Sequence, residues 1–168
     1  MDDPLRGIEG EIPALRRYAR FLLRDHEAAD DLVQDTLLRP VSRVHLWRPG
    51  NLRGWLFTIL RNLHLNRRRD AGRRPTILPL ADADEPRTGG EQVGRVEVAE
   101  VLAAFRRLSE EQREVMFLVV VEGLRYREAA ALLGVPVGTV MSRLARARER
   151  LRQLVEEPDD RPRLRRVK

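Results

Sequence analysis

"YREAAALLGVPVGTVMSRLARARERL" (residues 126–151) is the stretch that decides the fold of this chain. Counted from Tyr126, a small residue stands fifth (Ala130), a glycine ninth (Gly134) and a valine fifteenth (Val140). This spacing is typical of a helix-turn-helix. The alanine lets two helices cross closely, the glycine supplies a left-handed turn, and the valine seats the second helix on the first. The second helix of such a motif offers its N-terminal residues to the major groove of DNA.

The second helix of this motif is rich in arginine. Between residues 143 and 152 it carries five arginines and a single acidic residue, Glu149. A guanidinium group pairs bidentately with guanine or phosphate, although an arginine-rich helix can also be a solvated face of a bundle. The glycine turn beside the arginines favours DNA binding over that second interpretation.

The composition of the whole chain agrees with a polyanionic partner. Its 168 residues include 32 lysines and arginines against 26 aspartates and glutamates, so the net charge is +6. Such a balance favours nucleic acid. Residues that form helices dominate and no alternating strand pattern is present, so we predict an all-α chain.

Several kinds of chemistry are not indicated by this sequence. The absence of cysteine excludes disulfides, thiolate zinc sites and cysteine nucleophiles. The histidines (His26, His45 and His64) are scattered without metal-site spacing, and no phosphate-binding glycine loop is present. We therefore expect no enzymatic activity, no metal and no cofactor. No signal peptide or membrane-spanning run is found, so a cytoplasmic protein with no membrane partner is expected.

Two further helices are expected before the helix-turn-helix. "SEEQ" (109–112) is typical of a capping box, in which Ser109 caps the amide of Gln112 and the glutamine reaches back. The longest apolar run, "VMFLVVV" (115–121), is expected to be a buried helical segment. An earlier helix should bury the apolar residues that recur at helical spacing: Val98, Val101, Leu102, Phe105 and Leu108.

The first half of the chain predicts three more helices. The first covers 11–23, with a stripe formed by Ile12, Leu15, Ala19 and Leu22. The second covers 24–39 with Asp25 as its N-cap, and Pro40 should kink or stop it. Its expected buried residues are Ala29, Leu32, Val33, Thr36 and Leu37. The third begins after the N-cap Asn51, and its expected apolar stripe is Trp55, Leu56, Ile59, Leu60 and Leu63.

A change of composition separates the two halves. The stretch from residue 71 to residue 95 is rich in proline and glycine and has no sustained period, which predicts a flexible linker. The expected organisation is therefore a domain over 10–70, a linker over 71–95, a second domain over 96–156 and a basic tail over 157–168.

Both halves resemble the extracytoplasmic-function (group IV) sigma factors of bacterial RNA polymerase, of the sigma-70 family. "LSEEQREVMFLVVVEGLRYREAAALLGVPVGTVMSRLARARERL" (108–151) is similar to sigma region 4. "DDLVQDTLLR" (30–39) looks like region 2.2, and "LRGWLFTILRNLHLNRRR" (52–69) looks like regions 2.3 and 2.4. The resemblance covers about residues 10–155 and implies a region 2 helical bundle followed by a region 4 helix-turn-helix.

The resemblance implies a docking surface for core RNA polymerase on the second helix. In the family, region 2.2 binds the clamp helices of the largest subunit, and the resemblance also implies the flap as a partner on the polymerase. The residues that would carry the clamp contact are Asp31, Leu32, Gln34, Asp35 and Leu38. The spacing agrees in part, because all of these except Leu32 fall on one stripe at i, i+3, i+4 and i+7.

The resemblance also implies two promoter contacts. Family members open the minus-ten element by extruding one base, which Asn62 would contact, and an amide suits the edge of a flipped base. The matching minus-ten residues are Asn51, Leu52, Arg53, Arg61, Asn62, Arg67 and Arg68. Trp55 could stack on a base, but its spacing favours core packing. In region 4, the residues that match minus-thirty-five contacts are Thr139, Ser142, Arg143 and Arg146.

The function implied is promoter-specific initiation of transcription under the control of an anti-sigma factor. A stand-alone helix-turn-helix regulator is one alternative, and it would bind duplex DNA tightly without polymerase. A sigma-like decoy that binds an anti-sigma factor and starts no transcription is the other.

Overall fold

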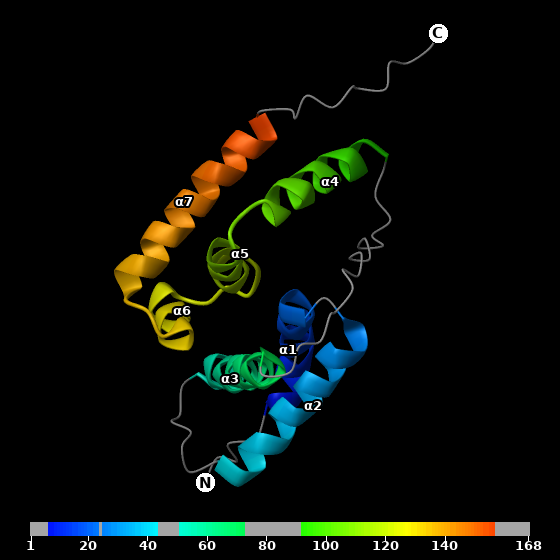
Figure 1. Cartoon of the computed structure of the whole chain (residues 1–168), viewed down its shortest axis with the longest axis vertical. Coiled ribbons are helices and arrows are strands. Elements are labelled where there is room, and N and C mark those ends of the chain that lie inside the picture. The colour runs from blue at the N-terminus through cyan, green and yellow to red at the C-terminus, as the bar shows by residue number, and fades with distance from the viewer. Residues whose placement is uncertain (1–6, 24, 44–50, 73–91, 157–168) are drawn as a thin grey trace. The chain divides into compact units, whose positions relative to one another are not determined.

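The computed structural model describes residues 7–23, 25–43, 51–72 and 92–156. All the regular elements within these ranges are helices (Figure 1), which confirms the predicted all-α fold. The chain divides into two compact units. The N-terminal unit is built around helices α1–α3, and the C-terminal unit is built around α4–α7.

The N-terminal unit is a three-helix bundle of α1 (Ile8–Leu23), α2 (His26–Arg43) and α3 (Leu52–Gly72), in which every pair of helices packs together. Its centre is aromatic, because the rings of Tyr18 and Phe57 stack with centroids 5.0 Å apart. The largest fully buried side chains around this pair are Leu15, Leu32, Leu56 and Leu60.

The two predicted N-caps of this unit are confirmed. The Ala28 amide donates to Asp25 Oδ1 at 2.8 Å, and the Gly54 amide donates to Asn51 Oδ1 at 2.8 Å. Each carboxylate or amide oxygen satisfies one of the backbone donors that a helix start leaves unpaired. The starts of α2 and α3 are therefore encoded locally.

Pro40 does not stop the second helix, because α2 continues to Arg43. Proline cannot donate to the Thr36 carbonyl and its ring crowds that carbonyl, so near the end of a helix its effect falls on the last turn. The buried face of α2 follows the prediction at Ala29, Leu32, Val33 and Thr36, whereas Leu37 is half-buried.

The first and third helices bury more than their apolar stripes indicate. In α1, Leu15 and Ala19 are buried as expected and Ile12 and Leu22 are half-buried. In α3, the predicted residues Leu56, Leu60 and Leu63 are buried, but Trp55 and Ile59 are only half-buried. Four other residues buried in the unit were not predicted from the sequence: Ala14, Tyr18, Phe57 and His64.

The C-terminal unit contains α4 (Gln92–Arg106), α5 (Glu110–Met116), a π-helix η2 (Phe117–Val121), α6 (Tyr126–Leu133) and α7 (Val137–Glu156). The predicted capping box opens α5. The Gln112 amide donates to Ser109 Oγ at 3.2 Å, and the Ser109 amide donates to Gln112 Oε1 at 3.2 Å.

Two expectations for buried apolar residues in this unit are wrong. Val115 to Leu118 are buried, but Val120 and Val121 at the end of the same run are more than half exposed. The cause is the π-turn, in which the Glu122 amide donates to Phe117 O at 3.0 Å and rotates the last residues away from the α-helical stripe. In α4, Val101 is likewise exposed and Ala104 is buried, and Leu108 is buried just after the helix ends.

The helix-turn-helix is formed as the sequence predicts. Gly134 has φ +69°, in the left-handed region that favours glycine. Ala130 and Val140, the other two residues of the motif, are buried. Helix α7 packs on α4 and α5 through its buried residues Val140, Leu144, Ala147 and Leu154.

The helices extend into both ends of the predicted linker, because α3 ends at Gly72 and α4 begins at Gln92. The rest of that linker (73–91) and the predicted basic tail (157–168) lie outside the described residues.

Candidate functional site

The face of α7 opposite its buried side carries small and apolar residues. Gly138, Met141 and Ala145 are all exposed, and the Met141 side chain keeps 53% of its surface accessible. Because these side chains are short or flexible, the backbone of α7 can closely approach a partner surface there. The arginines of α7 begin beside this uncharged stripe.

The four residues predicted for the minus-thirty-five contact all lie on α7. Thr139 and Ser142 are half-exposed, and Ser142 Oγ donates to Thr139 O at 3.0 Å. Arg143 is 22% exposed, and its Nη2 lies 2.8 Å from Glu111 Oε1, so α5 holds this guanidinium in place. Arg146 is exposed. Glu111 could not be predicted as a partner of Arg143, because no local sequence pattern links residues of α5 and α7.

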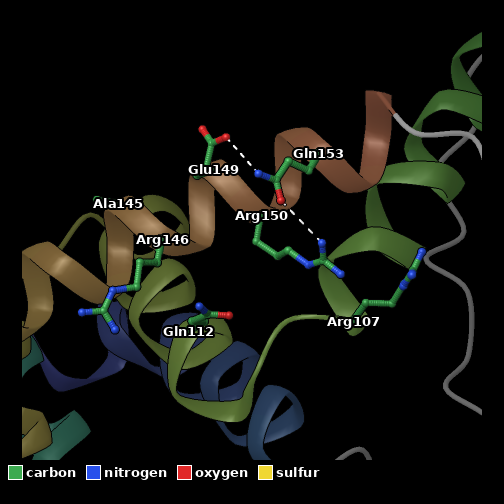
Figure 2. A pocket seen from close by; sticks show the side chains of 7 residues that line it. All are labelled: Arg107, Gln112, Ala145, Arg146, Glu149, Arg150 and Gln153. Atoms are coloured by element: carbon green, nitrogen blue, oxygen red, sulfur yellow. Dashed lines mark hydrogen bonds between the residues drawn. The ribbon is translucent and has the colours of Figure 1, made fainter.

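A hollow of about 500 Å³ lies beside α7 on the side of Arg146. Figure 2 shows α7 on one side of the hollow and the ends of α4 and α5 on the other. Its lining residues are Arg107, Gln112, Ala145, Arg146, Glu149, Arg150 and Gln153. We call it the arginine hollow. Arg107 and Gln112 were not identified from the sequence, because they join the site only through the packing of the helices.

Glu149 is the acidic residue of the arginine hollow, and neighbouring side chains satisfy its carboxylate. Gln153 Nε2 donates to Glu149 Oε1 at 3.1 Å (Figure 2). Arg152 Nη2 donates to Glu149 Oε2 at 2.6 Å. The hydrogen bond from Arg152 is the main cause that lowers the pKa of Glu149 below its usual value. The carboxylate is thus charged at neutral pH and already paired.

In the N-terminal unit, the predicted docking stripe on α2 is exposed except at one position. Asp31, Gln34 and Leu38 are exposed, with 72% of Leu38 accessible, and Asp35 is half-exposed. Leu32, which we also expected in the polymerase contact, has no exposed surface. The Leu32 side chain packs in the core of the unit. The expectation that Leu32 contacts the polymerase is therefore corrected, and Leu32 is not part of the docking surface.

The predicted minus-ten residues lie along α3 and at its start. Asn62 and Arg68 are exposed, and Arg61 is half-buried. Arg67 Nη2 lies 2.5 Å from Asp35 Oδ2, so an ion pair joins the docking stripe on α2 to this set of residues. The two predicted surfaces are therefore neighbours.

The start of α3 is held by a second pairing between helices. Arg53 Nε donates to Glu11 Oε2 of α1 at 2.6 Å. Asn51 and Leu52 beside it are half-buried. Glu11 was not foreseen from the sequence, because it is 42 residues away from Arg53.

The described ranges hold neither a cluster of metal ligands nor a membrane-spanning helix. There, no three His, Cys, Asp or Glu side chains are grouped so that they could hold a metal ion. None of the helices described is both long and apolar enough to cross a membrane.

Comparisons with known proteins match both units. The family "Sigma-70, region 4" matches residues 99–151, and the family "Sigma2 domain of PhyR" matches residues 8–61. The sigma factor EcfG of Rhodopseudomonas palustris is 41% identical over 160 residues, covering 92% of this chain and 87% of that protein. The sigma factor SigC of Mycobacterium tuberculosis is 37% identical over 166 residues, covering 92% of this chain and 86% of that protein.

A solved structure shows the same arrangement of helices along most of the chain. The sigma factor RpoE of Bartonella quintana, crystallised with the anti-sigma factor NepR, is 34% identical with a TM-score of 0.72. The match covers 93% of this chain and 97% of that chain. The relatives match across both helical units and over most of their own length. The chain therefore belongs to the extracytoplasmic-function sigma factors of bacterial RNA polymerase.

Proposed function

We propose that this chain directs promoter-specific initiation of transcription as a dissociable subunit of bacterial RNA polymerase, in the cytoplasm. The observation that carries the proposal is the 41% identity to a named sigma factor, which extends over 92% of the chain and includes both units. Synthesis of RNA belongs to the polymerase, and this chain supplies binding and positioning.

The α2 stripe is proposed to dock on the clamp helices of the largest polymerase subunit. Leu38 supports this assignment, because an apolar side chain that is 72% exposed gains free energy when a partner covers it. Asp31, Gln34 and Asp35 lie on the same face in the two turns before Leu38 and carry groups that accept or donate hydrogen bonds. Apolar side chains beside polar groups are usual in a protein interface.

The exposed face of α3 is proposed to open the minus-ten element. Asn62 presents an amide that can pair with the edge of an extruded base, and Arg61 and Arg68 supply positive charge for the strand that carries it. Binding the single strand must offset an unstacking free energy of a few kcal/mol. Arg53 and Arg67 already have acidic partners in the free protein, so either contact would exchange a protein carboxylate for a phosphate.

Helix α7 is proposed to enter the major groove at the minus-thirty-five element. The uncharged stripe of Gly138, Met141 and Ala145 permits a close approach to the base edges. Arg146 lies beside it, and Arg143 is held ready by Glu111. Binding at the two promoter elements is weak for each unit alone and strong together, because a tether raises the local concentration of the second unit.

The flap is the proposed second contact on the polymerase.

An anti-sigma factor is the proposed regulator of this chain. The Bartonella quintana relative was crystallised with the anti-sigma factor NepR. We expect the partner of this chain to cover surfaces that otherwise bind polymerase, so that the free sigma factor is released only when the partner is removed.

Run-off transcription with purified core polymerase tests the proposal. The expected result is specific transcripts that require this chain, with unpaired thymines at the minus-ten element detected by permanganate. Tight and specific binding to duplex DNA without polymerase would instead support a stand-alone regulator.

A sigma-like decoy is the second candidate, because residues 8–61 match a family named after the sigma-like domain of PhyR. A decoy would bind an anti-sigma factor but would give no transcripts and no open minus-ten element with core polymerase. The same reconstitution therefore separates the two functions.

A further inference from the structure

The start of α3 is joined to the start of α1 by a short ion pair and by an apolar side chain. Arg53 Nε donates to Glu11 Oε2 at 2.6 Å, although the two residues are 42 positions apart in the chain. Next to Arg53, Leu52 Cδ2 lies 3.7 Å from the point that a Cβ of Gly7 would occupy. Two consecutive side chains of α3 therefore lie against the beginning of α1.

The first turn of α3 is also fixed from within. The Gly54 amide donates to Asn51 Oδ1 at 2.8 Å, and Thr58 Oγ1 donates to Gly54 O at 2.8 Å. A Cβ on Gly54 would lie only 2.5 Å from Asn51 Nδ2, so the capping side chain packs directly on the backbone of this glycine. The turn thus has its own rigid shape, and its contacts with α1 decide where that turn lies in the unit.

The start of α1 is in turn a weak point of its helix, because Pro13 lies inside α1. Proline cannot donate to the Glu9 carbonyl and its ring crowds that carbonyl, which weakens the connection between the first turn and the rest of the helix. Further along, the stacked rings of Tyr18 and Phe57 hold α1 against α3. Before the proline, the ion pair between Glu11 and Arg53 has to supply that hold.

The ion pair of Arg53 is better shielded from water than the ion pair of Arg67. The Glu11 side chain is 20% exposed and that of Arg53 is 38% exposed, whereas Asp35 and Arg67 are 49% and 40% exposed. Separating a shielded pair leaves a carboxylate with neither its partner nor full hydration, so its loss costs more free energy than the loss of an exposed pair. Exchange of the carboxylate for a phosphate is therefore less favourable at Arg53 than at Arg67.

We propose that Glu11 is a positioning residue for promoter opening. It holds Arg53, and with it Asn51 and Leu52, at the place where the minus-ten strand is captured. The inference rests on the proposed function, in which the start of α3 meets that strand. Arg53 stays bound to Glu11 while the DNA opens. Because these residues are already ordered when the chain has folded, capture of the strand does not have to order them.

The two possible roles of Arg53 predict opposite effects of removing Glu11. If Arg53 left the carboxylate to bind a phosphate, Glu11 would compete with the DNA, and its removal would speed opening. If Glu11 positions Arg53, its removal slows opening, because the first turn of α3 loses its hold on α1. The sign of the change in rate therefore distinguishes positioning from competition.

The test follows the reaction of minus-ten thymines with permanganate over time, in holoenzyme bound to promoter DNA. Glu11→Ala should slow opening about tenfold, because a hydrogen bond between charged groups is lost. Glu11→Gln keeps an oxygen that can accept from Arg53 and should slow opening only about threefold. Glu9→Ala is the matched control, because it removes the same charge from an exposed residue of the same turn and should open DNA at the original rate. Faster or unchanged opening in Glu11→Ala, or equal slowing in Glu9→Ala, would overturn the proposal.

A double-variant comparison tests whether the two residues act as one unit. Arg53→Ala should slow opening as much as Glu11→Ala, and the double variant should be no slower than either. Arg53→Ala should also leave the salt slope of binding to single-stranded minus-ten DNA unchanged, whereas loss of a phosphate contact would lower it by about 0.7. Additive effects, or a lower slope, would assign Arg53 to the DNA and overturn the positioning role.

The affinity for core polymerase separates positioning from a general loss of structure. In Glu11→Ala it should stay within about twofold of the original value, because the α2 stripe does not include the pair. A loss of polymerase affinity as large as the loss in opening rate would show a merely structural role and contradict the inference. If Glu11→Ala does not fold, the sign of the Glu11→Gln effect decides in the same way.

Failure of this inference can be told from failure of the proposed function. An original chain that opens no minus-ten element with core polymerase would refute the proposed function. If the original chain opens the element and Glu11→Ala opens it as fast or faster, only the positioning role of Glu11 is refuted.

Discussion

Met141 illustrates what one side chain can contribute to the base preference of α7. It is the largest side chain of the uncharged stripe, and 53% of its surface is accessible. Apolar side chains in the major groove contact the methyl group of thymine, which uracil lacks. The exposure of Met141 on the uncharged stripe therefore predicts a contact with a thymine methyl group, in addition to any contact of the arginines with guanine.

We expect one thymine of the minus-thirty-five element to be read by Met141. Replacing that thymine with uracil removes a single methyl group and should weaken binding about fourfold, because burial of such a group contributes about 0.8 kcal/mol. The same replacement should have no effect on Met141→Ala. Holoenzyme affinities for a series of uracil-substituted promoters measure this. Val155→Ala, an exposed apolar residue near the end of α7, is the control that should keep the fourfold effect.

Two asparagines of α3 are expected to have separate roles. Asn51 caps the helix through the Gly54 amide, so Asn51→Ala should lower the free energy of unfolding by about 1 kcal/mol. Asn62 is exposed inside the helix, so Asn62→Ala should keep that free energy or raise it slightly, because alanine is the better helix former. Denaturant unfolding measures both variants.

Asn62→Ala, which should not lower stability, should nevertheless impair function. This variant should lose permanganate reactivity at the minus-ten element although it folds normally. A loss of stability in Asn62→Ala comparable to that in Asn51→Ala would contradict the assignment of the exposed amide to DNA.

Helix starts could be predicted from the sequence, and contacts between helices could not. Asp25, Asn51 and Ser109 each cap an amide within three residues, so the signal lies in a short stretch. The pairing of Glu11 with Arg53 joins residues of different helices, and no periodicity encodes it. The exposure of Val120 and Val121 was also missed, because a π-turn changes the helical period on which the expectation depended. The docking role of the α2 stripe stays a prediction, and Leu32, which the resemblance added to it, is buried.

The ion pair between α2 and α3 predicts how the two proposed surfaces can be separated. Asp35 and Arg67 are 49% and 40% exposed, and a pair this exposed contributes less than about 1 kcal/mol to stability. Asp35→Asn should weaken core polymerase binding about tenfold, from the loss of a charged hydrogen bond worth about 1.5 kcal/mol. Arg67→Gln should change the affinity for core polymerase by no more than about twofold. Loss of the exposed ion pair with Asp35 is a small effect and accounts for a change of that size.

Arg67→Gln should instead weaken binding to single-stranded minus-ten DNA and lower its salt slope by about 0.7. Fluorescence anisotropy with labelled core polymerase and labelled DNA gives both affinities. An equal loss of polymerase affinity in the two variants would mean that the polymerase recognises the ion pair and not the Asp35 carboxylate.

At the scale of the whole molecule, the sequence was enough to predict two helical units, because each carries its own apolar periodicity and caps. Each unit has its own buried centre, around Tyr18 and Phe57 in one and around Leu118, Val140 and Leu144 in the other. The limits proposed for the two domains stay a prediction. A surface formed by residues of several helices, such as the arginine hollow, could not be predicted from helical periodicity.

Because the two units have separate cores, we expect each to stay folded without the other. We expect them to act together because the chain between them connects them covalently. A protease site inserted between residues 73 and 91 allows the chain to be cut after folding. Cutting should lower promoter-specific run-off transcription by about a hundredfold at limiting protein, because the second unit loses the effective concentration that the connection provides. Circular dichroism should show that both units stay helical after the cut. The same insertion with a scrambled protease site is the control and should transcribe normally before and after protease treatment. Full activity of the cut chain would mean that each unit binds the polymerase strongly enough on its own, and the tethering argument would then be wrong.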